Sequence, residues 1–360
     1  MLWFSFALSF VFGAIAQKTH FCTMGALSDA VNIGDFARLR QWALAVAVAM
    51  LGFAALVYVG KIDPAKTIYA STRWQWLSAL VGGALFGFGM VLASGCGSKT
   101  LVRLGSGNLK AVVVFVVMGV SAFATLRGIT AVARDATVDK VYVSVDSGAS
   151  LGQWLASVSG WNVKLAVLVC ALVVALALII WVFKDREFIQ PDNLLAGLGI
   201  GTIVAAMWWG SGVLGYVSEH PDTLQEAFLT TNSGRVEALT FTAPMAYALD
   251  WLMFFSDKNK VLTWSVVSVA GVVLGSFAMA LVRRDFRWEG FRDQEDTANH
   301  LVGATLMGVG GVTALGCTIG QGLSGVSTLS FTSLVAVAAI MLGARLGFAY
   351  QIWRLERSAA

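Results

Sequence analysis

Residues 82–98, GGALFGFGMVLASGCGS, return in modified form as residues 303–320, GATLMGVGGVTALGCTIG. The two stretches superimpose at Cys96 and Cys317, and several of their glycines coincide. Each copy is an apolar, glycine-rich segment that leads into a Gly-Cys break. The chain therefore contains an internal repeat, and interrupted helices at matching places in two halves of a membrane protein predict a substrate site.

The composition predicts an all-α polytopic membrane protein. Of the 360 residues, 57% are hydrophobic and only 13% are charged, and the mean hydropathy is +0.74. Apolar runs of about 17 to 25 residues recur along the chain, the length that crosses a bilayer as a helix. A soluble protein of this size would carry more surface charge, and a membrane β-barrel would alternate with period two.

The net charge of +4 fits an anionic substrate, but it fits the positive loops of most membrane proteins equally well. No nucleic-acid partner is expected. The four cysteines and three histidines are far apart and form no C-x-x-C pair, so neither a metal site nor a cofactor is predicted. The expected membrane helices are residues 2–17, 41–60, 74–95, 109–133, 162–183, 193–217, 237–256, 262–282 and 329–353.

A charged loop near Pro191 predicts two halves within one membrane domain, residues 1–185 and 186–360. A weaker repeat aligns residues 13–22 with 201–210, which places Gly210 opposite Cys22. The loop that begins Arg283-Arg284-Asp285-Phe286-Arg287 is the strongest positive cluster and is expected on the cytoplasmic side.

Irregular backbone at membrane depth is tolerated only where it is buried in protein or lines a cavity, because unsatisfied peptide groups are costly in hydrocarbon. The breaks at Cys96 and Cys317 therefore predict a central constriction with broken or re-entrant helices. Helix N-termini at such breaks attract the negative end of an anion. A thiol adds a soft, weak donor that suits a ligand sulfur.

At three places the sequence resembles the YeeE/YedE family of bacterial sulfur-compound transporters. The matching segments are GCGSKTLVR (95–103) with GSGNLK (105–110), GCTIGQG (316–322), and FCTMG (21–25). The resemblance extends over nearly the whole chain, and the paired Gly-Cys segments are its most specific part.

The resemblance implies a multi-pass importer of the bacterial inner membrane that takes up thiosulfate or a related sulfur anion. It implies inverted-repeat halves around an hourglass-shaped path, in which three cysteines pass the ion by transient S–H···S hydrogen bonds. These would be Cys22 at the outer mouth and Cys96 and Cys317 at the constriction. It also implies a small cytoplasmic sulfur-carrier protein as a partner, while other members are associated with selenium or undefined sulfur species.

Residues beside the breaks are expected to support the path, and three cations are candidates for attracting the anion, although positive residues flank most spans anyway. The supporting residues are Gly95, Gly97, Ser98, Gly316, Thr318 and Gly320, and the cations are Lys18, Lys99 and Arg103. Cys170, among Val, Leu and Ala, is expected to be an ordinary buried side chain.

Two other classes of function stay open at this point. A membrane sulfurtransferase would form a persulfide on Cys96 or Cys317, which requires a thiolate activated by a base or a nearby cation. An anion channel or a sensor subunit would need neither coupling nor a partner. We expect a transporter rather than an enzyme, with thiols that stay protonated, because an unpaired thiolate in an apolar constriction would repel the anion.

Overall fold

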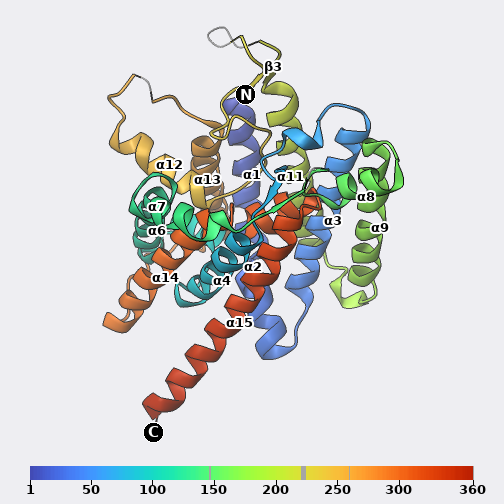
Figure 1. Ribbon diagram of the computed structural model, residues 1–360. Helices are drawn as coiled ribbons and strands as arrows, with labels where there is room; N and C mark the ends of the chain where they lie inside the picture. The colour runs from blue at the N-terminus through green and yellow to red at the C-terminus, as the bar shows by residue number, and fades with distance from the viewer. Residues whose placement is uncertain (146, 220–223, 259, 360) are drawn as a thin grey trace.

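The computed structural model describes residues 1–145, 147–219, 224–258 and 260–359, and within them the chain is a bundle of helices (Figure 1). This confirms the all-α polytopic class. Eight segments of the described chain are long and apolar enough to cross a membrane: Leu2–Ile33, Ala37–Tyr58, Trp76–Gly105, Leu109–Arg127, Val163–Phe183, Pro191–Leu214, Trp264–Arg283 and Phe331–Arg357.

The α-helices are α1 (Leu2–Thr19), α2 (Thr23–Ser28), α3 (Ala37–Tyr58), α4 (Trp76–Leu92), α5 (Gly97–Gly105), α6 (Leu109–Arg127), α7 (Ile129–Ala136), α8 (Leu151–Ser159), α9 (Val163–Phe183), α10 (Pro191–Leu194), α11 (Ile200–Trp209), α12 (Thr242–Met253), α13 (Trp264–Arg283), α14 (Gln294–Thr313) and α15 (Phe331–Ala359). Four π-helical turns are η1 (Asp29–Ile33), η5 (Leu195–Gly199), η6 (Gly210–Leu214) and η7 (Gly320–Gly325). Three 3-10 turns are η2 (Pro64–Lys66), η3 (Val138–Lys140) and η4 (Arg186–Phe188). Two antiparallel pairs of two-residue strands join β1 (Arg73–Trp74) to β2 (Val143–Ser144) and β3 (Tyr216–Val217) to β4 (Ala227–Phe228).

The expected membrane helix at residues 237–256 is wrong. Helix α12 has only 12 residues, a length of about 18 Å, which is too short to cross the hydrocarbon layer. The residues before it are extended, because Val236 exchanges backbone hydrogen bonds with Lys66 and Ile68 instead of starting a helix. The expected span at 109–133 also divides, since α6 ends at Arg127 and α7 begins after Gly128.

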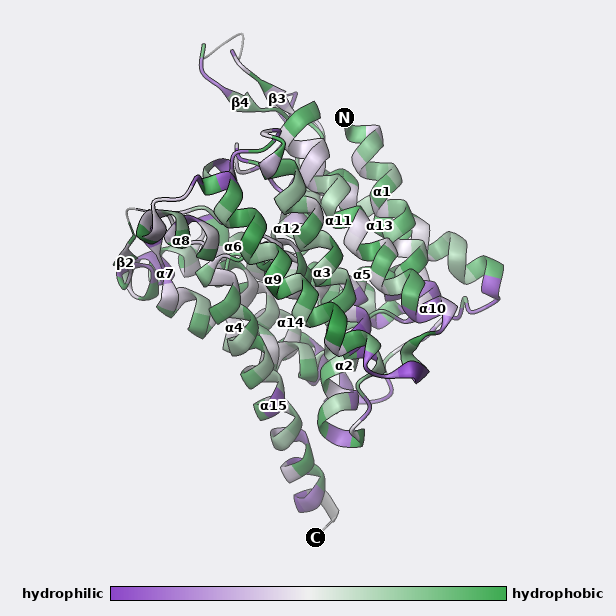
Figure 2. Ribbon diagram, turned by 90° about the vertical axis from the view of Figure 1, so that its right-hand side faces the viewer, coloured by the Kyte–Doolittle hydropathy of each residue, from purple (hydrophilic) through white to green (hydrophobic). Residues whose placement is uncertain are grey.

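The bundle has two polar ends. At one end Gly215, next to β3, lies against the Met1 side chain, and we name this end the hairpin face. At the other end the Arg283 guanidinium donates to the Lys18 carbonyl oxygen at 2.8 Å, and we name this end the basic face. Hydrophobic residues cover the helices between the faces and hydrophilic ones gather at the loops (Figure 2). Helix α15 extends beyond the basic face and ends in the C-terminus (Figure 1).

The two glycine-rich helices, α4 and α14, cross at the centre and exchange equivalent contacts. Gly82 packs against the carbonyl of Gly310, and Gly310 packs against the carbonyl of Gly82. Gly89 and Gly303 exchange carbonyl contacts in the same way. A Cβ at any of these four positions would lie 2.6–2.7 Å from the facing oxygen, so only glycine permits this approach.

The outer contacts of the two helices are exchanged as well. Gly87 of α4 packs on the backbone of α15 at Ile340, and its counterpart Gly308 of α14 packs on α6 at Met118. Contacts exchanged between equivalent positions are what a two-fold axis produces. An inverted relation between halves 1–185 and 186–360 remains a prediction, and this exchange supports it.

Candidate functional site

The three path cysteines stand in the same local backbone. Two residues before each cysteine is a non-glycine residue with positive φ: His20 (52°), Ser94 (54°) and Leu315 (59°). Such residues end the preceding helix, and the cysteine then begins the next helical turn. Left-handed non-glycine residues are costly and gather at functional sites, so their use at all three breaks is itself a sign of a site.

The two copies of the repeat have an equivalent backbone hydrogen bond at their breaks. The Gly95 amide donates to the Met90 carbonyl at 2.9 Å, and the Gly316 amide donates to the Gly311 carbonyl at 2.7 Å. The fourth equivalent place differs, because the helix runs through Gly210 into the π turn η6 without a left-handed residue. A cysteine and a break thus occur together at three of the four places.

Two of the three thiols accept a hydrogen bond from the amide three residues later. The Gly25 amide lies 3.4 Å from Cys22 Sγ, and the Gly320 amide lies 3.4 Å from Cys317 Sγ. Cys96 also stands at the start of a helix, α5, and the Lys99 amide lies on the side of its sulfur, but the Cys96 side chain makes no such cap hydrogen bond. Each sulfur therefore sits at the positive N-terminal end of a helical turn, where a ligand anion is also favoured.

Cys96 lies near both of the other thiols. Its side chain contacts that of Cys22, and it is close enough to Cys317 for their charges to interact. All three residues are buried and none is in a disulfide. The structure therefore brings together the three cysteines that the sequence named, although they are up to 295 positions apart (317 − 22).

Hydroxyl groups surround the central thiol. Ser98 Oγ lies 3.3 Å from Cys96 Sγ, and Thr318, from the second copy of the repeat, faces the same sulfur. Apart from this sulfur, the buried Thr318 hydroxyl has no hydrogen-bond partner among the described residues. A thiol is only a weak acceptor, so the hydroxyl is available to donate to a bound anion.

Cys317 has different neighbours. Thr240 Oγ1 lies 4.0 Å from its sulfur, and the amides of Ile319 and Phe241 also point to it. The Tyr69 hydroxyl donates to the Gly320 carbonyl at 2.5 Å and so holds the turn that carries the thiol. No cation is among the groups that contact this sulfur in the described residues.

The predicted glycines are close to neighbouring atoms. A Cβ at Gly320 would lie 2.5 Å from Thr240 Oγ1, and one at Gly316 would lie 3.2 Å from the Gln321 amide. At Gly95 the nearest atom would be Cγ of Lys99 at 3.1 Å, and at Gly97 it would be Cε of Met118 at 3.2 Å.

Two of the three predicted cations lie near the thiols. Lys99 is electrostatically coupled to both Cys22 and Cys96, and Arg103 lies beside it. Neither cation forms an ion pair with a described carboxylate. Lys18 instead pairs with Asp192 at 3.4 Å on the surface of the basic face, and the structure does not bring its amine to the thiols. Within the described residues, no group of three or more His, Cys, Asp or Glu side chains could hold a metal ion.

A pocket of about 240 Å³ on the hairpin face adjoins the break before Cys317, and we name it the vestibule. It is lined by Ile68, Tyr69, Ser71, Arg73, Gln75, Ser233, Arg235, Leu315 and Thr332. Leu315 is the left-handed residue two positions before Cys317, so the vestibule ends at that break. Its two arginines give it a positive charge that suits an anion.

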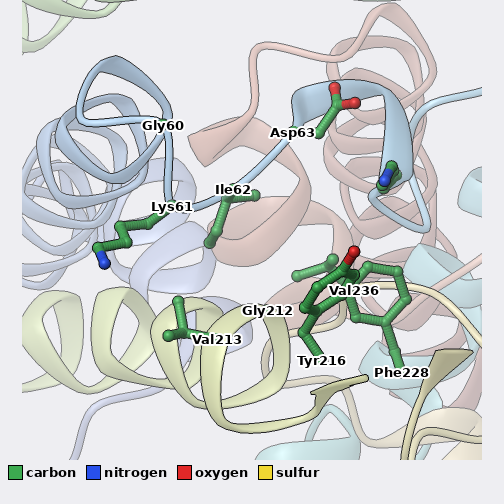
Figure 3. A pocket seen from close by; sticks show the side chains of 10 residues that line it. Gly60, Lys61, Ile62, Asp63, Gly212, Val213, Tyr216, Phe228 and Val236 are labelled. Carbon is green, nitrogen blue, oxygen red and sulfur yellow. The ribbon is translucent and has the colours of Figure 1, made fainter. Parts of the chain in front are cut away.

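A second pocket on the hairpin face, of about 380 Å³, lies between the loop at Gly60–Asp63 and strands β3 and β4. Figure 3 shows the Tyr216 and Phe228 rings side by side in this pocket and Ile62 facing them across it. None of the three path cysteines lines it, so its volume does not identify it as the substrate site.

The position of Cys22 conflicts with one of two expectations. The sequence places the Arg283 loop in the cytoplasm, and the family resemblance places Cys22 at the outer mouth. In the structure both lie toward the basic face, since Arg283 bonds to Lys18 and Gly25 lies against the Arg38 guanidinium. The basic face cannot be both the cytoplasmic side and the side of the outer mouth, so the two expectations exclude each other.

Sequence reasoning missed the loop residues that line the vestibule or contact the turn at Cys317. Tyr69, Arg235 and Thr240 belong to irregular segments without any repeated pattern. Their role follows only from the pairing of residues 66–68 with Val236, which brings two distant loops over the Cys317 break. No signal in the local sequence would have identified them.

A bundle in which eight segments of the described chain can cross a membrane, and which has buried helix breaks at matching places of two repeats, has the architecture expected of a membrane transporter. Residues 18–346 match the family model described as "Sulphur transport", and the chain belongs to this family. It is a transport protein and not an enzyme, and the resemblance drawn from the Gly-Cys segments is confirmed.

Three relatives have names that agree with the family. The chain is 27% identical over 355 residues to "Thiosulfate transporter TsuA" of Spirochaeta thermophila, which covers 95% of this chain and 97% of that protein. It is 28% identical over 341 residues to the Escherichia coli K12 protein of the same name, with 92% and 89% covered. "Probable transporter YedE" of Escherichia coli K12 matches over 98 residues at 29% identity, covering 27% of this chain and 23% of that protein.

Proposed function

We propose that this protein imports thiosulfate across the bacterial inner membrane, with the three thiols as successive binding stations. The observation that supports it best is the repetition of one arrangement three times. Each thiol lies at a helix N-terminus behind a left-handed residue. The names of the two long relatives supply the substrate, since both are thiosulfate transporters.

The direction of travel follows from the charged loops. Short loops rich in Lys and Arg favour the cytoplasm, which puts the basic face inside and the hairpin face outside. The anion then enters the vestibule between Arg73 and Arg235 and meets Cys317 first. It passes to Cys96 and to Cys22, and leaves beside Lys99. In this scheme Cys22 is the last thiol and not the first.

Each station offers the anion two kinds of contact. The thiol donates a weak S–H bond to the terminal sulfur, while hydroxyls such as Ser98 and Thr318 donate to the oxygens. Weak bonds suit transport, because a station must release the ion to the next one. Lys99 supplies a positive charge near Cys96 and Cys22 that attracts the anion. This role accounts for the lysine without a persulfide intermediate on either cysteine.

Thiosulfate-dependent growth of a bacterium without other sulfate and thiosulfate importers tests this function. At matched amounts in the membrane, the intact protein should restore growth, and Cys96→Ala and Cys317→Ala should each lower uptake by about 10- to 100-fold, the loss of one hydrogen bond to a charged ligand. Cys170→Ala, a buried cysteine of α9, is the matched control and should leave uptake unchanged.

Failure of the intact protein to restore growth would point to another sulfur or selenium species as the substrate. Growth restored by both variants would contradict the cysteine stations.

We also propose a small cytoplasmic sulfur-carrier protein as the partner that receives the ion at the basic face. Arg284 and Arg287 are exposed there and suit an acidic partner. Co-purification of a candidate carrier with the intact protein, and its loss in a double Arg284→Glu, Arg287→Glu variant that still reaches the membrane, would support this docking. Equal recovery with both proteins would reject it.

A further inference from the structure

The vestibule has a buried carboxylate beside it that the transport scheme leaves unused. Glu237 is 4% exposed and lies in the extended segment between Val236 and the start of α12. Among the described residues it forms no ion pair. A carboxylate that is buried without a cation is expensive to keep ionised, so its presence beside an anion path calls for an explanation.

Neutral groups alone hold this carboxylate. Ser233 donates to Glu237 Oε1 through its amide at 2.9 Å and through its hydroxyl at 2.5 Å. The Ser265 hydroxyl and the Asn232 amide complete the set. Serine hydroxyls can accept as well as donate, so the same site also satisfies the protonated carboxyl.

The carboxylate is connected to both the vestibule and the first thiol. Ser233, which bonds to Glu237, is itself a lining residue of the vestibule and offers a proton a route of one hydrogen bond. Tyr69, another lining residue, is electrostatically coupled to both Glu237 and Cys317. Four residues after Glu237, the Phe241 amide contacts the Cys317 sulfur.

We propose that Glu237 is a proton-binding site linked to the substrate, whose carboxylate takes up a proton when the anion occupies the vestibule and loses it when the vestibule is empty. This inference rests on the proposed function. An ionised Glu237 and a dianion in the adjoining vestibule repel each other, and protonation removes that repulsion. Binding linkage is reciprocal, so the anion favours the protonated carboxyl as much as the proton favours the anion.

The titratable and charged groups near Glu237 do not change their charge in the pH range where the linkage would be measured. They are Tyr69 from the loop before β1, Tyr247 from α12 and Arg235 from the same segment, with Arg127 of α6 beyond Tyr247. Tyrosine stays neutral and arginine stays charged between about pH 5.5 and 8.5. Burial raises the pKa of Glu237 above its usual value, and burial also raises that of Tyr69.

Calorimetric titration of the purified full-length protein with sodium thiosulfate, across that pH range, tests the proposal. The affinity of the intact protein should fall as the pH rises, by at most about tenfold per pH unit for a single proton. Glu237→Gln keeps an acceptor for Ser233 but cannot ionise, so it should bind at all pH values as tightly as the intact protein does at the acidic end. Glu226→Gln, an exposed glutamate of the same face that pairs with Lys66, is the matched control and should keep the pH dependence.

Two further measurements keep the test decisive if Glu237→Gln does not fold. The intact protein should take up protons on binding, which makes the measured heat depend on the ionisation enthalpy of the buffer. Ser233→Ala removes a donor to the ionised carboxylate, so the fall in affinity should move to higher pH.

A pH-independent affinity of the intact protein, or an unchanged pH dependence in Glu237→Gln, would overturn the linkage and leave the transport function standing. No thiosulfate binding by the intact protein at any pH would overturn the proposed substrate itself.

Discussion

The breaks at Cys96 and Cys317 have the same backbone and different surroundings. Both follow a left-handed residue, and in both the cysteine directly precedes a helical turn. Around Cys96 are a second thiol, two hydroxyls and the amine of Lys99, whereas around Cys317 are amides, Thr240 and the loop held by Tyr69. A duplicated sequence therefore reproduces the local geometry of a station, and the neighbours from other segments determine its chemistry.

The largest difference in uptake between the two breaks should appear when a glycine near each cysteine is replaced by alanine. Gly320→Ala places a Cβ 2.5 Å from Thr240 Oγ1, so the loop that covers Cys317 must move. Displacements near 1 Å in a site cost up to about 100-fold in rate, and we expect uptake to fall by about that much. Gly95→Ala meets Cγ and Cβ of Lys99 at 3.1 and 3.3 Å, which requires a shift of only a few tenths of an ångström, and it should cost less than about threefold. Uptake of radiolabelled thiosulfate into cells at equal membrane levels measures both, and equal losses would contradict the comparison.

Removing one neighbour from each break should sharpen the contrast. Lys99→Met keeps the length of the side chain but removes the charge near Cys22 and Cys96, and it should raise the KM for uptake by about tenfold. Tyr69→Phe removes a single hydrogen bond, to the Gly320 carbonyl, worth about 1 kcal/mol, and should lower uptake by about fivefold. Rising salt should weaken uptake by the intact protein and by Tyr69→Phe more than uptake by Lys99→Met. The same salt response in all three would argue against an electrostatic role for Lys99.

The smallest effect should be on the free energy of unfolding. The pH dependence of that free energy should have opposite signs for a carboxylate on the basic face and one on the hairpin face. Burial raises the pKa of Asp296 on the basic face, but the hydrogen bonds from Lys110 and from the Arg292 amide, together with the charges of His300 and Lys110, outweigh it and hold that pKa below the usual value. Its contribution to stability is present above the ordinary pKa and is lost as the pH falls through the lowered one. Glu237 has a raised pKa, so its contribution is complete below the ordinary value and is lost as the pH rises through the raised one.

Thermal unfolding in detergent at several pH values measures this difference. Asp296→Asn should remove part of the destabilisation in acid, and Glu237→Gln should remove part of the destabilisation at neutral pH. Parallel pH profiles in both variants would contradict the assignment of opposite signs.

The sequence predicted the membrane helices with few errors, because about 20 apolar residues in a row have hardly any other stable environment. The error at residues 237–256 has a definite cause. Val236 pairs with a loop about 170 positions earlier in the chain, and residues 237–241 stay extended against it and against Cys317. Hydropathy does not encode a long-range backbone pairing. It therefore predicts a span over residues 237–256, although only residues 242–253 are helical.

By itself the sequence determined the class of protein, the family, and the three cysteines at breaks, since a repeated Gly-Cys interruption in an apolar helix is visible without coordinates. Only the tertiary structure decided which groups meet at those breaks. In the structure Thr318 lies beside Cys96, and Lys18 pairs with Asp192 at the surface. Glu237 is bonded to Ser233, which lines the vestibule. The physical reason is that a helix break follows from a few adjacent residues, whereas the groups around a thiol come from segments that only the packing of the whole bundle brings together.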